Sequence, residues 1–389
     1  MHLLGKNITL YRYNAETALK NESFQDIVNP ELNSIYIPDS MKAFISGEHV
    51  ETMEFIEDDN RSAILPDPFV SIGGTDFFLS VKGIGSTTDP FSMRSLDRFH
   101  VQSLVKSLEL KKKLEEHETY SNRFITGELW LRGSPYGGQG LEHASIAMKA
   151  AGYANETSIN GFRIAPILRV NLIPEELEKS VKNIFWYRRF SGKIVQEIRL
   201  VPSNVRIYFH SYNTIGSNAK QVFDLFGIDT NEKTLRFETN FVRSALAMLT
   251  LFPRTLSRTQ EGLYTGLDFY DVWLDKDAVI APDGTIFFVD LEGIEAIQIR
   301  REKVRDKIEE QVFRSLYEFM FAYEQIDHER RARFNGSEDR KIQFEILLRE
   351  AVKSDPFLDL IDEGTTLKLL IKNKLDNEEL NMLFPILDR

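Results

Sequence analysis

The pattern of hydrophobic and polar positions predicts strands in the first half of the chain. Short apolar runs at residues 77–81, 162–172 and 195–201 are typical of buried strands, and charged or glycine-rich segments separate them. Between the first two runs, residues 141–151 are rich in alanine, which has the highest helix propensity, and Gly152 follows as a stop. We therefore expect a mixed sheet with one helix beside it.

Beyond Pro202 the periodicity becomes mainly helical. Residues 233–251 and 302–326 place apolar residues at helical intervals, and residues 340–384 predict two shorter helices. One hairpin interrupts this pattern, because two short apolar runs within residues 278–289 flank a Pro-Asp-Gly turn.

These patterns together predict two lobes. Residues 1–201 are expected to form an N-lobe that carries an N-terminal extension and an amphipathic helical insertion near residues 92–120. Residues 202–389 are expected to form a mainly helical C-lobe. The acidic run at residues 54–59 is expected to be a solvated face without chemistry.

Composition narrows the range of functions. Hydrophobic residues make up 42% and charged residues 28% of the chain, which is typical of a folded globular protein. The net charge of −11 argues against nucleic acid as a partner, because such binding depends on clustered Lys and Arg. The chain contains no cysteine, which excludes thiolate metal sites and a cysteine nucleophile. We find neither a secretory leader nor an apolar stretch of transmembrane length, so we expect a cytoplasmic protein without a membrane partner.

Three charged residues follow the order of parts in protein kinases. Lys82 ends a predicted strand and is followed by Gly83 and Gly85, Glu142 opens the alanine-rich helix, and Asp290 ends the hairpin in an Asp-x-x-Gly sequence. In that arrangement the lysine binds nucleotide phosphates, the glutamate holds the lysine, and the aspartate binds Mg²⁺. We therefore expect an α+β, bilobal, protein-kinase-like fold with a mixed sheet and an αC-type helix in the N-lobe.

Two arginines add a second phosphate-binding element. Arg199 ends the strand at 195–201, and Arg206 follows seven residues later in the sequence Arg-Leu-Val-Pro-Ser-Asn-Val-Arg. Arginine side chains bind phosphate oxygens through two parallel hydrogen bonds. Ordinary kinases have no such pair in this connection, so the pair indicates a phosphate-binding site that differs from theirs.

These motifs resemble the selenoprotein O family, kinase-like proteins that transfer AMP rather than phosphate. The matching segments are Lys-Gly-x-Gly at residues 82–85, the glutamate-led helix at 142–152, the Arg-Val-Ala-Pro-Ser-x-Val-Arg segment at 199–206, and the metal motif at 290–293. The resemblance covers roughly residues 70–295. It departs from the family at residues 275–277, where Asp-Lys-Asp replaces the Asp-Asn pair.

The resemblance implies a reaction and its residues. Asp277 and Asp290 would hold Mg²⁺ or Mn²⁺, and the general base would be Asp275, with Asp271 as the second choice. ATP would donate AMP to a Ser, Thr or Tyr hydroxyl of a protein substrate. Two alternatives stay open, which are a kinase that transfers the γ-phosphate to a protein or small molecule and a nucleotide-binding pseudokinase scaffold. The ammonium of Lys276 favours the scaffold, because it competes with the metal ion for the neighbouring carboxylates.

Overall fold

The fold was analysed in a computed structural model. The structure describes residues 3–24, 29–38, 51–59, 62–84, 139–156, 163–175, 178, 192–207, 215–249, 257–268, 277–290, 295–304, 322–323 and 325–334. The predicted helices at 92–120 and 340–384 lie outside these residues, as does most of the predicted helix at 302–326.

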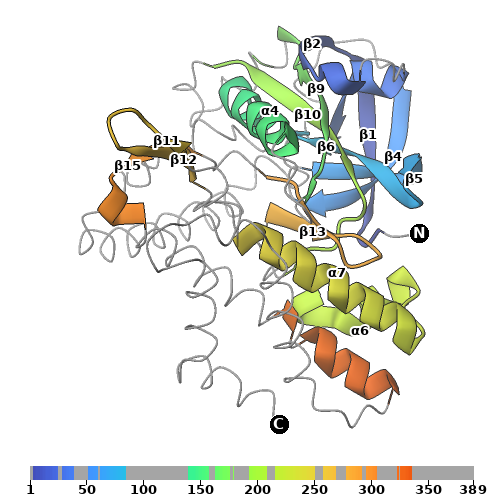
Figure 1. The fold of residues 1–389 in the computed structure, drawn as a ribbon. Helices are drawn as coiled ribbons and strands as arrows, with labels where there is room; N and C mark the ends of the chain where they lie inside the picture. The colour runs from blue at the N-terminus through green and yellow to red at the C-terminus, as the bar shows by residue number, and fades with distance from the viewer. Residues whose placement is uncertain are drawn as a thin grey trace, which may run out of the picture.

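A nine-stranded antiparallel sheet dominates the first half of the chain (Figure 1). Its main path runs in the order β2-β9-β10-β6-β5-β4-β1-β3, and β7 pairs with β10 off this path. The strands are β1 (Asn7–Asn14), β2 (Glu16–Lys20), β3 (Ser34–Pro38), β4 (Glu51–Asp59), β5 (Ser62–Ile72), β6 (Thr75–Lys82), β7 (Gln139–Gly140), β9 (Ile167–Leu172) and β10 (Ile194–Val201).

The sheet curls so that its two ends meet. Only Ala15 separates β1 from β2, although these strands stand near opposite ends of the pairing order. Across the curl, the buried Gln196 side chain accepts a hydrogen bond from the backbone N–H of Tyr36 at 2.8 Å and donates one to its carbonyl at 2.6 Å. The amide of Gln196 thus satisfies the backbone of β3, whose polar groups would otherwise be buried without partners.

Helix α4 (Leu141–Glu156) packs against β9 and β10 (Figure 1). Its buried positions Ala144, Ala147 and Ala151 recur at helical spacing and present a flat face of small side chains to the sheet. The face of β10 that carries Val195 shares this core, so α4 covers one side of the strand that precedes Pro202.

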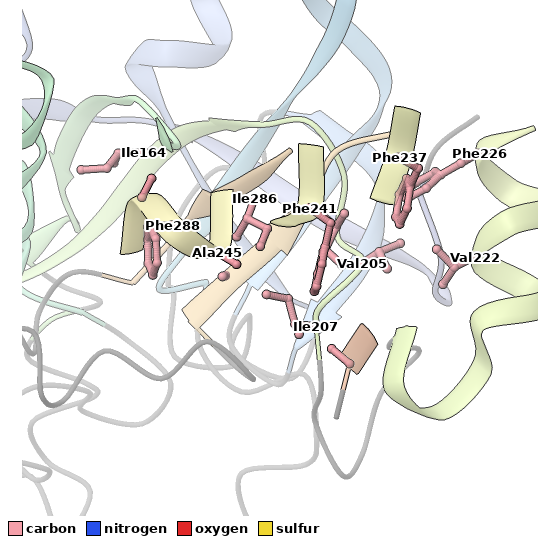
Figure 2. Close-up of a cluster of buried hydrophobic side chains, with 14 of the residues drawn as sticks. Ile164, Val205, Ile207, Val222, Phe226, Phe237, Phe241, Ala245, Ile286 and Phe288 are labelled. Carbon is pink, nitrogen blue, oxygen red and sulfur yellow. The ribbon is translucent and has the colours of Figure 1, made fainter. Parts of the chain in front are cut away.

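A second core forms around the hairpin and two helices. Strands β13 (Ala278–Ile280) and β14 (Ile286–Phe288) pair antiparallel, and β14 also pairs in parallel with β8 (Arg163–Ile164). Helix α6 (Ile215–Phe226) and helix α7 (Asn231–Leu249) line the same cluster, where Phe241 of α7 lies near Ile286 (Figure 2).

Gly284 seats the tip of this hairpin on α7. Its φ is +90°, and an added Cβ would lie 2.1 Å from the carbonyl oxygen of Phe237. Asn240 of the same helix donates a hydrogen bond of 2.9 Å to the carbonyl oxygen of Asp283. Glycine is therefore required here both for the backbone conformation and for the close approach to α7.

A third sheet lies in the second half of the chain. Strands β11 (Ser257–Arg258), β12 (Tyr264–Asp268) and β15 (Glu295–Ile299) pair antiparallel in that order. Because β12 precedes the hairpin and β15 follows Asp290 after four residues, this sheet adjoins both chain segments that flank the hairpin.

The predicted bilobal, protein-kinase-like fold with a mainly helical C-lobe is wrong. Strands outnumber helices among the described residues, and the nine-stranded sheet extends through the first sixty residues. These residues had given a mixed pattern because the curled sheet is buried unevenly along them; β1, for example, alternates irregularly between exposed and buried positions. The second half also holds the β11-β12-β15 sheet, whose short strands around Gly262 and Gly266 gave no alternating signal.

Several separate predictions are confirmed. The runs at 77–81 and 195–201 are strands, residues 141–151 and 233–249 are helical, and residues 278–289 form the predicted hairpin.

No helix within the described part of the chain is long and apolar enough to cross a membrane.

Candidate functional site

Lys82 ends the central strand β6. Its backbone pairs with Ser62 of β5 on one side and with Glu197 of β10 on the other, and only 8% of its side chain is exposed. The next residue, Gly83, has a φ of +92°, and an added Cβ would lie 2.8 Å from the carbonyl oxygen of Val195. The glycine therefore lets the chain turn away directly after the lysine while staying close to β10.

Asp290 meets Lys82 from the far end of the sequence. The Nζ of Lys82 lies 2.9 Å from Oδ2 of Asp290, whose side chain is 19% exposed. The aspartate comes two residues after β14, so this ion pair connects the nine-stranded sheet with the hairpin. The structure thus brings together two of the residues that the sequence singled out, although they are far apart in the chain.

Asp277 lies beside Asp290 across the hairpin. Its carbonyl oxygen accepts hydrogen bonds from the N–H groups of Val289 at 2.8 Å and Asp290 at 3.4 Å. Asp277 is itself buried, with 4% exposure. The backbones of Asp277 and Asp290 are neighbours, and carboxylate oxygens are ligands that Mg²⁺ prefers, so these residue types fit such an ion. Within the described residues there is no cluster of three or more metal-ligating side chains.

Arg199 and Glu197 form a buried ion pair on β10. Both point to the same face of the strand, because they are two residues apart, and the exposed fractions of their side chains are 4% and 0%. The Nη2 of Arg199 contacts Oε1 of Glu197. Sequence reasoning identified the arginine but missed the glutamate. The sequence did contain a signal, because Glu197 and Arg199 place two opposite charges on the face of the strand that otherwise carries Val195 and Val201.

Arg206 is bound to a residue that was expected to be solvated. Its Nη2 lies 3.0 Å from Oδ2 of Asp58, near the end of β4, and the Asp58 side chain is only 7% exposed. The expectation of an inert acidic face at residues 54–59 therefore fails at Asp58, although Glu54 is exposed. The backbone of Arg206 bridges to Val279 of β13, which places this arginine next to the hairpin.

Glu142 does not lie where the lysine partner was expected. It is exposed in the first turn of α4, and the structure gives it no ion pair with any described residue. Its carboxylate there is favourable for the helix dipole. The ion pair of Lys82 runs to Asp290 instead.

Three further predicted site residues lie outside the described part of the chain. They are Gly85 and the two predicted bases, Asp271 and Asp275. The described site therefore consists of two buried cations, Lys82 and Arg199, with the carboxylates of Glu197 and Asp290 and the neighbouring Asp277. Beside it lies the Arg206–Asp58 pair.

Comparison with known proteins gives no relative for this chain: no family model matches it, and neither a curated protein nor a solved structure does. The resemblance to the selenoprotein O family stays a prediction that rests on the motifs alone.

Proposed function

We propose that this protein is an ATP- and metal-dependent nucleotidyltransferase that transfers AMP to a hydroxyl group of a protein. The observation that carries the proposal is the 2.9 Å ion pair between Lys82 and Asp290. Lys82 ends a strand and is followed by a glycine, and Asp290 lies beside a second aspartate, Asp277. The ion pair joins these two segments. These are the residue types that bind the phosphates and the metal ion of a nucleotide.

Each residue of this ion pair can exchange the other for a group of opposite charge on a nucleotide. Lys82 and Asp290 neutralise each other at a site where only small fractions of either side chain are exposed. A metal–triphosphate complex carries both kinds of charge, so its phosphates would pair with Lys82 and its metal ion would pair with Asp290. Each buried ion would keep an opposite charge beside it through this exchange.

The proposed reaction displaces pyrophosphate. The acceptor hydroxyl oxygen attacks the α-phosphorus of ATP, the bond from that phosphorus to the bridging oxygen breaks, and pyrophosphate leaves with the electron pair. The hydroxyl proton passes to a carboxylate, for which Asp275 and Asp271 are the predicted bases. A Mg²⁺ or Mn²⁺ ion held by Asp277 and Asp290 would supply a Lewis acid. Lys82 and Arg199 would stabilise the charge on the departing pyrophosphate.

A second candidate is a nucleotide-binding scaffold without turnover. The observation that favours it is that both arginines already have carboxylate partners, Glu197 for Arg199 and Asp58 for Arg206. The positive charge that they offer to terminal phosphates is reduced accordingly. This same observation weakens the argument from the arginine pair against γ-phosphate transfer.

Position-specific labelling distinguishes these functions. The protein is incubated with a cell lysate, Mg²⁺ or Mn²⁺, and ATP that is labelled on either the α- or the γ-phosphate, and protein-bound label is measured. We expect label from the α-phosphate only, and none after chelation of the metal. Label from the γ-phosphate alone would refute AMP transfer in favour of a kinase. Neither label, despite measurable ATP binding, would establish the scaffold.

Two variants control this experiment. Asp290→Asn removes a charge from the site and should abolish incorporation of the α-label. Asp229→Asn makes the same chemical change at a fully exposed aspartate that pairs with Lys233. Equal labelling by these two variants would show that Asp290 has no part in the reaction.

A further inference from the structure

Glu197 occupies the position next to Lys82 that the sequence had given to Glu142. Strands β6 and β10 pair antiparallel with Glu197 directly opposite Lys82, so both side chains lie on the same face of the sheet, a few ångströms apart. Glu197 is fully buried, whereas Glu142 is exposed. The only glutamate on this strand therefore lies between the two buried cations of the site.

Charge balance gives Glu197 a role that Asp290 cannot fill. In the described structure the two cations Lys82 and Arg199 contact the carboxylates of Asp290 and Glu197, respectively. If Asp290 binds a metal ion, Glu197 still provides a carboxylate beside Lys82. A buried ammonium without a counter-charge would be strongly destabilised or would lose its proton.

The carboxylate oxygens of Glu197 point to the same role. Oε1 contacts Arg199, while Oε2 is buried and has no hydrogen-bond partner among the described residues. A buried carboxylate oxygen without a donor is unusual in a folded protein and calls for a cation or donor that arrives in another state. A lysine directly opposite on the neighbouring strand is in position to become that donor once Asp290 is engaged elsewhere.

We propose that Glu197 is the positioning residue of the site, which holds Lys82 and Arg199 in place for the nucleotide phosphates. This role rests on the proposed function, and it gives a strand residue the task that a helix glutamate was expected to perform. Glu197 itself is not expected to touch the nucleotide, because its negative charge would repel the phosphates. Its effect on binding must therefore pass through the two cations.

A double-mutant cycle tests this coupling. ATP binding in the presence of Mg²⁺ is measured by calorimetry for the wild-type chain, Lys82→Met, Glu197→Gln and the double variant, with Glu232→Gln as an exposed control. Glu197→Gln should weaken ATP binding about 10–100-fold, the range found when a residue that orients a ligand-binding group is lost. In the Lys82→Met background the same substitution should have a smaller effect, because only the contribution through Arg199 remains. The losses in the two backgrounds should differ by more than about twofold, the limit within which independent sites add.

The possible outcomes separate the two proposals. If the wild-type chain does not bind ATP with Mg²⁺, the proposed function is overturned and the positioning role with it. If the wild-type chain binds ATP but Glu197→Gln behaves like Glu232→Gln, only the positioning role is overturned. Equal losses from Glu197→Gln in both backgrounds would also overturn it, because a merely structural glutamate acts independently of the lysine.

A conservative variant keeps the test valid if Glu197→Gln fails to fold, which thermal unfolding would reveal. Glu197→Asp retains the charge but withdraws the carboxylate from Lys82 by one methylene. It should weaken ATP binding more in the wild-type background than in the Lys82→Met background, where only Arg199 remains for Glu197 to position. Coupling of less than about twofold between the two substitutions would refute the positioning role.

Discussion

Two buried arginines, Arg199 and Arg330, lie among carboxylates in different parts of the molecule. Arg199 stands on β10 with Glu197 beside it and Lys82 on the next strand. Arg330 lies in the helical segment at residues 325–334, with its Nη2 2.6 Å from Oδ1 of Asp327 and its Nε 3.4 Å from Oε1 of Glu238 on α7. Both guanidinium groups are almost fully buried, with side-chain exposures of 4% and 2%.

The two arginines differ in the residues that surround them. The Arg330 cluster connects two helices, and the neighbouring Arg331 holds the other oxygen of Asp327 at 2.7 Å. Its partners all belong to helices that pack together. The Arg199 cluster stands where β6 ends, next to an aspartate from the hairpin and a second aspartate behind it. The first arrangement holds helices together, whereas we propose that the second exchanges a partner for a ligand. Buried charge therefore does not by itself mark a functional site.

The largest expected effect on stability comes from Arg330→Met. The substitution removes the arginine from a buried ion pair with Glu238, whose side chain is 1% exposed, and breaking such a pair destabilises a protein by about 3–5 kcal/mol. Urea unfolding should show this loss. The fraction that remains folded should bind ATP as the wild-type chain does. A stability within about 0.5 kcal/mol of wild type would show that the Arg330 cluster does not hold the helices together.

The matching substitution Arg199→Met should affect activity more than stability. Lys82 lies opposite Glu197 and can replace the lost guanidinium as its counter-charge, so the loss of stability should be smaller than for Arg330→Met. Transfer of the α-label should fall about 10²–10³-fold, as when one charge-assisted contact to a transition state is removed. If the two methionine variants lose equal stability and Arg199→Met keeps its transfer rate, the distinction between the two clusters is wrong.

Gly284→Ala tests the connection between the two regions. The glycine seats the Asp290 hairpin on Phe237, next to Glu238 of the Arg330 cluster. A Cβ at this backbone conformation, against the Phe237 carbonyl, should destabilise the protein by about 1–3 kcal/mol and displace the hairpin. Urea unfolding and ATP binding should therefore both change. A change in stability without any change in ATP binding would show that Asp290 is positioned independently of α7.

The smallest effect is expected at the exposed pair of Asp229 and Lys233. The hydrogen bond and positive charge of Lys233 lower the pKa of Asp229 below its ordinary value of 3.8. A carboxyl whose pKa is lower in the folded state stabilises the protein above that ordinary value, and this contribution is lost as the pH falls through the lowered pKa. Asp229→Asn should therefore leave unfolding at neutral pH almost unchanged, because water screens an exposed pair. A clear loss at neutral pH would contradict this account of exposed charges.

The sequence predicted the elements whose patterns are local. The alanine face of α4, the apolar run of β6 and the Pro-Asp-Gly turn of the hairpin each depend on a few neighbouring residues, and the structure contains all three. The curl of the large sheet could not be predicted in this way. It depends on contacts such as that between Gln196 and Tyr36, which are 160 residues apart.

In the site too, residues marked by their own segment were predicted, and residues that depend on distant contacts were not. Lys82 and Asp290 were identified from their positions at the ends of a strand and a hairpin, and the structure joins them. Asp58 was missed because its partner, Arg206, is distant in the sequence, and Glu197 was missed because its position opposite Lys82 depends on strand pairing. A strand that carries Glu and Arg on one face among apolar residues is the pattern that could have identified Glu197.

The central claim is that Lys82 lies at the phosphates of a bound nucleotide. An ATP derivative with an acyl group on its terminal phosphate transfers that group to a lysine held beside the phosphates, and mass spectrometry identifies the modified residue. We expect Lys82 to be acylated and an excess of ATP to prevent it, although its side chain is only 8% exposed. The exposed Lys193 and Lys233 should show no modification that ATP prevents. Unmodified Lys82 beside modified Lys193 and Lys233 would contradict the claim.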